Sequence, residues 1–150
     1  MKLLLATAVF VSIALGGGLI IGLTNIPDEW YGSLHKPPFT PPNWLFGPVW
    51  SILYVLIGIA GARIWIRGNW SPGISLWIAQ MVLNFLWSPA FFGLRQPVIA
   101  LAIIMSMLPV IVLFVIQQWR ADRVASMLFL PYAAWVAFAS VLNASIVWLN

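Results

Sequence analysis

Five long apolar stretches, separated by shorter polar segments, make up most of the chain. A helix needs about 20 mostly apolar residues to cross roughly 30 Å of hydrocarbon, and all five stretches reach that length. They run continuously, whereas strands of a membrane barrel alternate apolar and polar residues over about ten positions. The pattern predicts an all-α integral membrane protein, a five-transmembrane-helix bundle forming one domain over residues 1–150. The expected spans are 3–23, 44–66, 74–93, 97–119 and 124–149.

The long first loop, residues 24–43, is the one connection that exceeds a tight turn. It holds five prolines together with Trp30 and Tyr31. Proline fixes φ and biases the preceding residue toward extended geometry, so we expect a stiff, non-helical loop. Long loops often act as lids over binding sites, but Trp and Tyr at a membrane boundary also sit at headgroup level without any ligand. Composition leaves both interpretations open.

Composition supports the membrane assignment and excludes several other classes. The chain is 63% hydrophobic and 7% charged, whereas a soluble domain carries about a quarter charged residues. Its seven basic residues are scattered singly and form no stripe of the kind that binds nucleic acid, so no nucleic-acid partner is expected. The absence of cysteine excludes disulfides and thiolate metal sites. The first apolar stretch exceeds the 7–15 residues, roughly, of a signal-peptide core, so we expect a retained helix.

The basic residues are divided unequally between the two sides of the predicted bundle. Five helices place the chain ends on opposite sides, and the N-terminal side receives five of the seven basic residues. The positive-inside rule then predicts a cytoplasmic N-terminus in a bacterial inner membrane. The residues on that side are Lys2, Arg63, Arg67, Arg120 and Arg123, against Lys36 and Arg95 on the other.

Three spans carry stripes of aromatic residues, two of them with amides, at helical spacing. Polar side chains in membrane helices usually face the bundle interior, and flat aromatic area with a few amides is typical of a ligand pocket. The alternative is an ordinary aromatic core in which the amides bridge neighbouring helices. The stripes are Phe46, Trp50 and Tyr54; Trp77, Gln80, Asn84, Trp87 and Phe91; and Tyr132, Trp135, Ala139 and Asn143.

Residues for acid–base chemistry are scarce. The three acids and the single histidine, His35, all lie in predicted loops, so we expect no catalytic set, no metal site and no proton-coupled transport. His35 is read either as a haem ligand or pH sensor, or as a solvated side chain. In the first span, Gly18 and Gly22 have the spacing that lets membrane helices approach closely.

Four linked motifs follow one another along the chain. They are Trp30-Tyr31 with Lys36-Pro37 and Pro41-Pro42; Trp44, Phe46, Pro48-Val49-Trp50 and Leu53-Tyr54; Asn84 to Pro89 with Phe91-Phe92-Gly93; and Pro131-Tyr132 with Trp135 and Leu142-Asn143. Together they resemble the tryptophan-rich sensory protein family, TspO/MBR. Its mammalian members are the translocator protein, or peripheral-type benzodiazepine receptor.

The resemblance implies a homodimeric five-helix receptor, sensor or carrier that regulates tetrapyrrole levels or stress responses. Its ligands would be protoporphyrin IX or haem, and also sterol-like or benzodiazepine-type molecules, with no cofactor required. The alternative is light-dependent porphyrin breakdown that uses Trp50 and Trp135. The family's sterol motif needs an aromatic residue followed by Lys or Arg near the end of the fifth helix, and residues 143–150 lack this pair. The implied pocket comprises Tyr31, Pro41, Trp50, Tyr54, Asn84, Trp87, Phe91, Trp135, Ala139 and Asn143, to which the third-span stripe adds Gln80.

Overall fold

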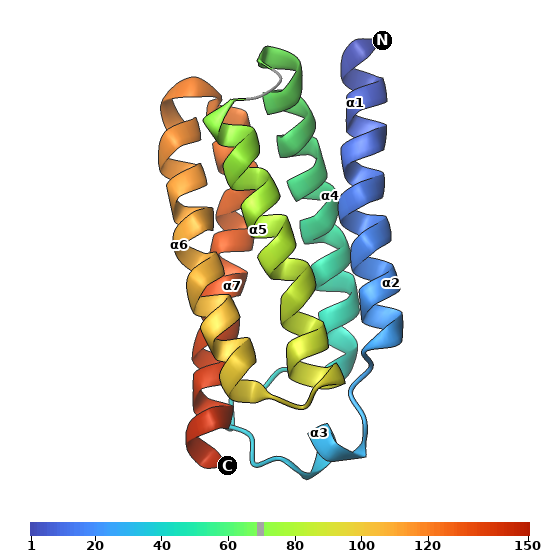
Figure 1. Cartoon of the computed structure of the whole chain (residues 1–150), viewed down its shortest axis with the longest axis vertical. Helices are drawn as coiled ribbons and strands as arrows, with labels where there is room; N and C mark the ends of the chain where they lie inside the picture. The colour runs from blue at the N-terminus through green and yellow to red at the C-terminus, as the bar shows by residue number, and fades with distance from the viewer. Residues whose placement is uncertain (69–70) are drawn as a thin grey trace.

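The computed structural model describes residues 1–68 and 71–150, and within them every regular element is helical. Within these residues, five helical stretches are long and apolar enough to cross a membrane, which confirms the predicted five-helix bundle to within one or two residues at each end. In Figure 1 they run side by side, with the N-terminus and α3 at opposite ends of the bundle. The elements are α1 (Lys2–Val11), η1 (Ser12–Gly16), α2 (Gly17–Thr24), α3 (Glu29–Ser33), α4 (Asn43–Arg67), α5 (Pro72–Ser88), η2 (Pro89–Gly93), α6 (Pro97–Ala121) and α7 (Arg123–Leu149).

Glycine allows the first span to pack against α4. A Cβ atom on Gly58 would lie 2.5 Å from the Cα of Val11, and one on Gly18 would lie 2.1 Å from the ring of Tyr54. Real Cβ atoms do not approach this closely, so both contacts depend on glycine. Nothing lies within 4 Å of the equivalent position on Gly22. Of the predicted glycine pair, Gly18 therefore makes the close helix contact.

The first loop contains a short helix, which corrects the expectation that the loop is non-helical. The Asp28 side chain accepts a hydrogen bond from the backbone N–H of Tyr31 at 3.2 Å and caps α3. Asp is a strong N-cap residue. The five prolines lie outside Glu29–Ser33, so they do not interrupt this turn.

A turn of π-helix, η2, widens the end of the third span. It begins at Pro89, which cannot donate a backbone hydrogen bond. The N–H of Leu94 bonds back to the Pro89 carbonyl at 2.8 Å. Arg95 then adopts φ 54°, a left-handed conformation uncommon for a residue with a side chain, and the chain turns into α6. The third span therefore departs from regular α-helix at Pro89 through a π turn.

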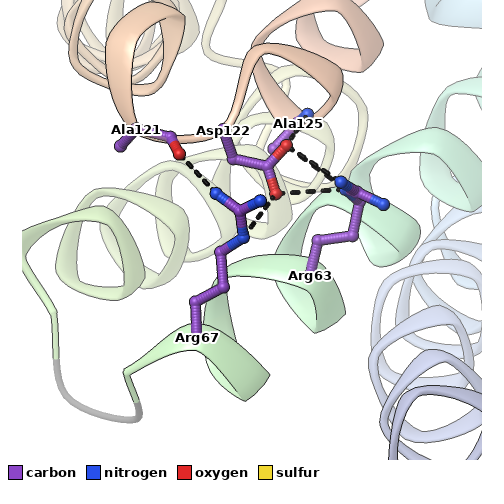
Figure 2. Close-up of polar contacts among 5 residues, drawn as sticks. All are labelled: Arg63, Arg67, Ala121, Asp122 and Ala125. Carbon is purple, nitrogen blue, oxygen red and sulfur yellow. Dashed lines mark hydrogen bonds and ion pairs between the residues drawn. The ribbon is translucent and has the colours of Figure 1, made fainter.

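A cluster of charges joins α4 to the α6–α7 connection at the N-terminal end (Figure 2). Asp122 is 3% exposed and accepts hydrogen bonds from Arg63 Nε at 3.1 Å and Nη2 at 3.1 Å. It also caps α7 through the N–H of Ala125 at 3.1 Å. Arg67 pairs with the same carboxylate at 3.4 Å and donates to the Ala121 carbonyl. A buried acid therefore holds Arg63 at the end of α4.

Candidate functional site

A cavity of about 340 Å³ lies beneath the first loop, at the α3 end of the bundle. This volume is within the range of roughly 300–1,000 Å³ that is typical of small-molecule sites. Its walls come from α2, α4, α5, η2, α6 and α7, and Pro27 and Tyr31 of the loop complete it. None of the residues that line it is charged. The interior therefore suits an uncharged, apolar body.

Aromatic rings form two stacked pairs on the cavity wall. Trp50 and Tyr54 of α4 stack with centroids 5.4 Å apart and an interplanar angle of 29°. Trp87 and Phe91 stack at 5.4 Å and 28°. Trp135 of α7 lies edge-on to the ring of Phe46, with centroids 5.9 Å apart. Rings placed in this way offer flat faces to a ligand, and each aromatic pair adds about 0.5–1.5 kcal/mol beyond area burial.

A directed chain of hydrogen bonds crosses the bundle from the cavity wall into the core. Tyr54 Oη donates to Asn84 Oδ1 at 2.7 Å, and Asn84 Nδ2 donates to Tyr132 Oη at 2.8 Å. Tyr132 Oη donates to Gln80 Oε1 at 2.8 Å, and Gln80 Nε2 donates to the Trp77 carbonyl at 2.9 Å. These groups are buried, and a satisfied buried network fixes the orientation of its members. The amides of Asn84 and Gln80 are thus already engaged within the protein.

Asn143 makes a second polar bridge beside the cavity. Its Oδ1 accepts from Trp87 Nε1 at 3.1 Å, and its Nδ2 donates to the Pro97 carbonyl at 2.9 Å. The residue links α7, α5 and the start of α6 while it is 1% exposed. It therefore holds the Trp87 ring in place against the cavity.

Trp135 contributes a buried donor without a partner. Its Nε1 is the single buried side-chain nitrogen or oxygen, among the described residues, that has no hydrogen-bond partner. Native proteins pair nearly all such groups, and leaving one unpaired costs about 1–3 kcal/mol. Because Trp135 lines the cavity, a ligand that carries an acceptor would satisfy this N–H.

The first loop closes the cavity and is attached at two places. Asp28 pairs with Arg95 at 2.7 Å, which joins the start of α3 to the α5–α6 connection. Asn150 exchanges two hydrogen bonds, each 2.9 Å long, with the backbone N–H and carbonyl of His35. The cap bond from the N–H of Tyr31, together with Arg95, holds the pKa of Asp28 below its ordinary value, which keeps the ion pair intact near neutral pH.

Tyr31 anchors the loop between the two attachments. It is 4% exposed, and its ring lies 5.3 Å from the ring of Phe92 on η2. Burial raises the pKa of the Tyr31 hydroxyl, so the ring stays neutral. Lys36 Nζ lies 4.7 Å from the same ring and donates to the carbonyls of Gly32 and Leu34. The loop therefore occupies the lid position, with its one lysine next to the cavity wall.

Comparisons with known proteins agree with this architecture. The TspO/MBR family model matches residues 7–149. The chain is 39% identical to the tryptophan-rich protein TspO of Archaeoglobus fulgidus, over 97% of this chain and 96% of that protein. It is 34% identical to the tryptophan-rich sensory protein of Cereibacter sphaeroides, covering 91% and 87% of the two chains. The human translocator protein is 34% identical, over 84% of this chain and 79% of that protein.

The chain belongs to the TspO/MBR family. It is an integral, multi-pass membrane protein of that family, as its five apolar helices also require.

In this TspO/MBR protein, most of the pocket residues expected from the sequence surround one cavity. Pro41 and Gln80 do not line it. Gln80 is fully buried behind Tyr132, where both the oxygen and the nitrogen of its side-chain amide form hydrogen bonds within the protein. His35 lies outside the cavity as well. The expected residues that do line it are Tyr31, Trp50, Tyr54, Asn84, Trp87, Phe91, Trp135, Ala139 and Asn143.

Sequence reasoning missed part of the lining. The first span contributes Leu19 and Gly22, and α6 contributes Ile104 and Met107. These residues are apolar within apolar spans, so no feature of the sequence separates them from lipid-facing neighbours. Asn25 also lines the cavity, and the sequence contains a signal for it: it is an amide that directly follows the first apolar span, next to the loop that covers the cavity.

Proposed function

We propose that this TspO/MBR protein is a membrane receptor, sensor or carrier that binds tetrapyrroles such as protoporphyrin IX or haem in the cavity beneath the first loop. The observation that carries the proposal is an uncharged, aromatic cavity with one unsatisfied donor, Trp135 Nε1. A flat macrocycle supplies large apolar faces for the stacked rings, and its polar atoms supply acceptors for the indole N–H. The protein would thereby regulate tetrapyrrole levels or a stress response.

The charged periphery of a tetrapyrrole has to remain outside the apolar cavity, because an unpaired carboxylate in an apolar site is strongly disfavoured. Lys36 is the loop cation next to the cavity wall, held over the Tyr31 ring. It is the group best placed to pair with a propionate at the cavity mouth. Sterol-like and benzodiazepine-type molecules share the flat apolar body and are weaker candidates for the same space.

The sensor or receptor part of the proposal rests on the family and on how the loop is attached. One relative is named a sensory protein and another a translocator protein. In this chain the loop is held by one ion pair and by the Asn150 bonds to His35. A ligand that pushes against Tyr31 would alter these loop contacts, so that binding inside the cavity changes the conformation of the loop at the protein surface.

Titration with protoporphyrin IX, followed by tryptophan quenching, tests the role of the unpaired donor. Trp135→Phe keeps the aromatic area and removes the N–H. We expect affinity to fall by a factor of about 2 to 13, equivalent to one hydrogen bond of roughly 0.5–1.5 kcal/mol. Trp148→Phe is the matched control, because Trp148 is 89% exposed and does not line the cavity. Equal affinities for the two variants would contradict the proposed contact.

A second candidate function is light-dependent breakdown of the bound porphyrin. The observation that favours it is that Trp50 and Trp135, the two tryptophans assigned to this chemistry by the resemblance, line the same cavity. Illumination of the complex separates the two functions. A binding protein leaves only the bleaching products that free porphyrin gives, whereas an enzyme yields a distinct product that disappears in Trp135→Phe.

We also propose that the N-terminus is cytoplasmic in a bacterial inner membrane. The α1 end of the bundle has five basic residues and one acid, and the α3 end has two basic residues and two acids. Because the chain has no cysteine, single cysteines introduced at Ser33 and at Arg120 report the sidedness directly. We expect a membrane-impermeant maleimide to label Ser33→Cys but not Arg120→Cys in intact spheroplasts. The reverse pattern would overturn this orientation.

A further inference from the structure

A second depression lies on the outside of the bundle, between α1 and the last turns of α4. It has a volume of about 540 Å³ and is at the opposite end of the bundle from the aromatic cavity. Lys2 is the one charged residue in its lining. We call this depression the α1–α4 groove. Its lining residues are Lys2, Leu5, Ala6, Val9, Phe10, Trp65 and Ile66.

Close packing at Phe10, near the end of α1, and a small residue one turn earlier create the groove. A Cβ atom on Gly61 would lie 2.6 Å from the ring of Phe10, so Phe10 sits directly on α4. Phe10 packs edge-on against Trp77 at 4.9 Å and tilted against Trp65 at 6.1 Å. One turn earlier, α1 presents only the methyl group of Ala6. The helix surfaces therefore separate toward Lys2 and leave a hollow floored by aromatic rings.

The groove faces the hydrocarbon of the membrane. Leu5 is 69% exposed, Val9 is 47% exposed and Ile66 is 44% exposed. Only 11% of the apolar window of the first span is buried within the bundle. An apolar hollow of this kind in a bilayer is filled by a hydrocarbon chain.

The charge at the mouth of the groove selects the headgroup. The formal net charge of +4 lies entirely at the α1 end, because the two basic and two acidic residues at the α3 end cancel. The one acid there, Asp122, is already engaged by Arg63 and Arg67. Lys2 makes no ion pair within the described part of the chain. Its positive charge is therefore available for an anion supplied by the membrane.

We propose that the α1–α4 groove binds an anionic phospholipid. One acyl chain lies along Leu5, Val9 and the Trp65 ring, and the phosphate pairs with the ammonium group of Lys2. Lysine suits this role, because its aliphatic stem stays in the apolar boundary while its charge reaches the headgroup level. A free phosphate ion would leave the apolar lining uncovered. The site is separate from the aromatic cavity and does not depend on the ligand proposed there.

Photo-crosslinking in nanodiscs tests the site on the full chain. Two probes carry the same diazirine-labelled acyl chain, one on phosphatidylglycerol and one on phosphatidylcholine, each diluted into phosphatidylcholine discs. We expect the phosphatidylglycerol probe to label Leu5 to Phe10 and Trp65 about fivefold more than the phosphatidylcholine probe, the factor equivalent to about 1 kcal/mol per basic residue near a headgroup. Both leaflets have the same composition, so the orientation of the protein does not affect the result.

Three variants identify the anchoring charge. Lys2→Gln should abolish the preference for phosphatidylglycerol, and Lys2→Arg should keep it. Arg120→Gln is the matched control, because Arg120 is an exposed base at the same end that does not line the groove. Its preference should stay unchanged.

Three results would overturn the proposal. One is equal labelling by the two probes in the unaltered protein. Another is a loss of preference in Arg120→Gln as large as in Lys2→Gln, which would indicate general attraction to a basic surface. The third is a groove that neither probe labels, which would mean that something other than a lipid chain, such as a second copy of the protein, covers it.

Discussion

Replacing Asp122 with asparagine tests the contact that ties the α6–α7 connection to α4. The carboxylate is 3% exposed, accepts two hydrogen bonds from Arg63 and caps α7 through Ala125. Asparagine has nearly the same shape and is an equally good N-cap residue. The substitution therefore removes the charge and keeps the cap, so the change in stability isolates the ion pair.

The size of the effect follows from how deeply the partners are buried. Breaking a fully buried ion pair costs about 3–5 kcal/mol, and an exposed pair contributes about 0–1 kcal/mol. The Arg63 side chain is 27% exposed and the Arg67 side chain is 56% exposed. We therefore expect Asp122→Asn to lower the free energy of unfolding by about 1–3 kcal/mol. Arg67→Gln, which removes only the exposed partner, should cost less than about 1 kcal/mol.

The pH dependence of stability gives an independent check. Burial alone would raise the pKa of Asp122, but hydrogen bonds from Arg63 and Ala125 and the charges of both arginines outweigh it and lower the pKa. A folded pKa below the unfolded value of about 3.9 means that the contribution is fully present above that value and is lost as pH falls through the folded pKa. Unfolding in detergent, measured from neutral to acid pH, should show wild type and Asp122→Asn converging in acid. Equal stability at neutral pH would refute the reasoning.

Three further predictions concern the cavity and its lid. Gly18→Ala should destabilise the protein by about 1–3 kcal/mol in thermal unfolding, because the new methyl group would overlap the Tyr54 ring. Gly16→Ala is the control and should not destabilise the protein, because the space around Gly16 is open. Similar melting temperatures for the two variants would contradict this prediction. Asp28→Asn keeps the α3 cap and removes the ion pair to the α5–α6 connection, so stopped-flow measurements should show faster release of protoporphyrin IX at an unchanged melting temperature. Tyr132→Phe should lower the free energy of unfolding by about 1–3 kcal/mol, because it leaves buried amides unpaired; a change near zero would mean that the network is not a stabilising element.

The sequence was sufficient to predict the helices because membrane thickness fixes their length. The span predicted at 97–119 is observed at Pro97–Ala121, and the one at 124–149 is Arg123–Leu149. Hydrophobic length depends on the segment itself, so no tertiary information is needed. The short helix α3 was missed because proline content outweighed a local signal, the capping residue Asp28.

The partners of the polar groups could not be predicted, because they depend on how the helices rotate against one another. Helical spacing placed Gln80 and Asn84 on one face, and that prediction is consistent with the burial of both. Both amides bond to Tyr132, but only Asn84 lines the cavity. Helical spacing alone does not distinguish the two positions. Asp122 gave a signal that was not used: a lone acid immediately before a helix, between two basic residues, is typical of an N-cap that pairs across the bundle. The homodimer expected from the resemblance stays a prediction.

The central claim is that a tetrapyrrole occupies the cavity beneath the first loop, and filling that cavity tests it most directly. Ala139 lines the cavity, whereas Ala134, on the same helix, is exposed on the outside of the bundle. Protoporphyrin IX is titrated into wild type, Ala139→Phe and Ala134→Phe, after circular dichroism has established that all three are folded. We predict that Ala139→Phe weakens binding by more than about tenfold, equivalent to ~1.4 kcal/mol, and that Ala134→Phe binds as wild type does. Wild-type affinity in the folded Ala139→Phe variant would contradict the claim.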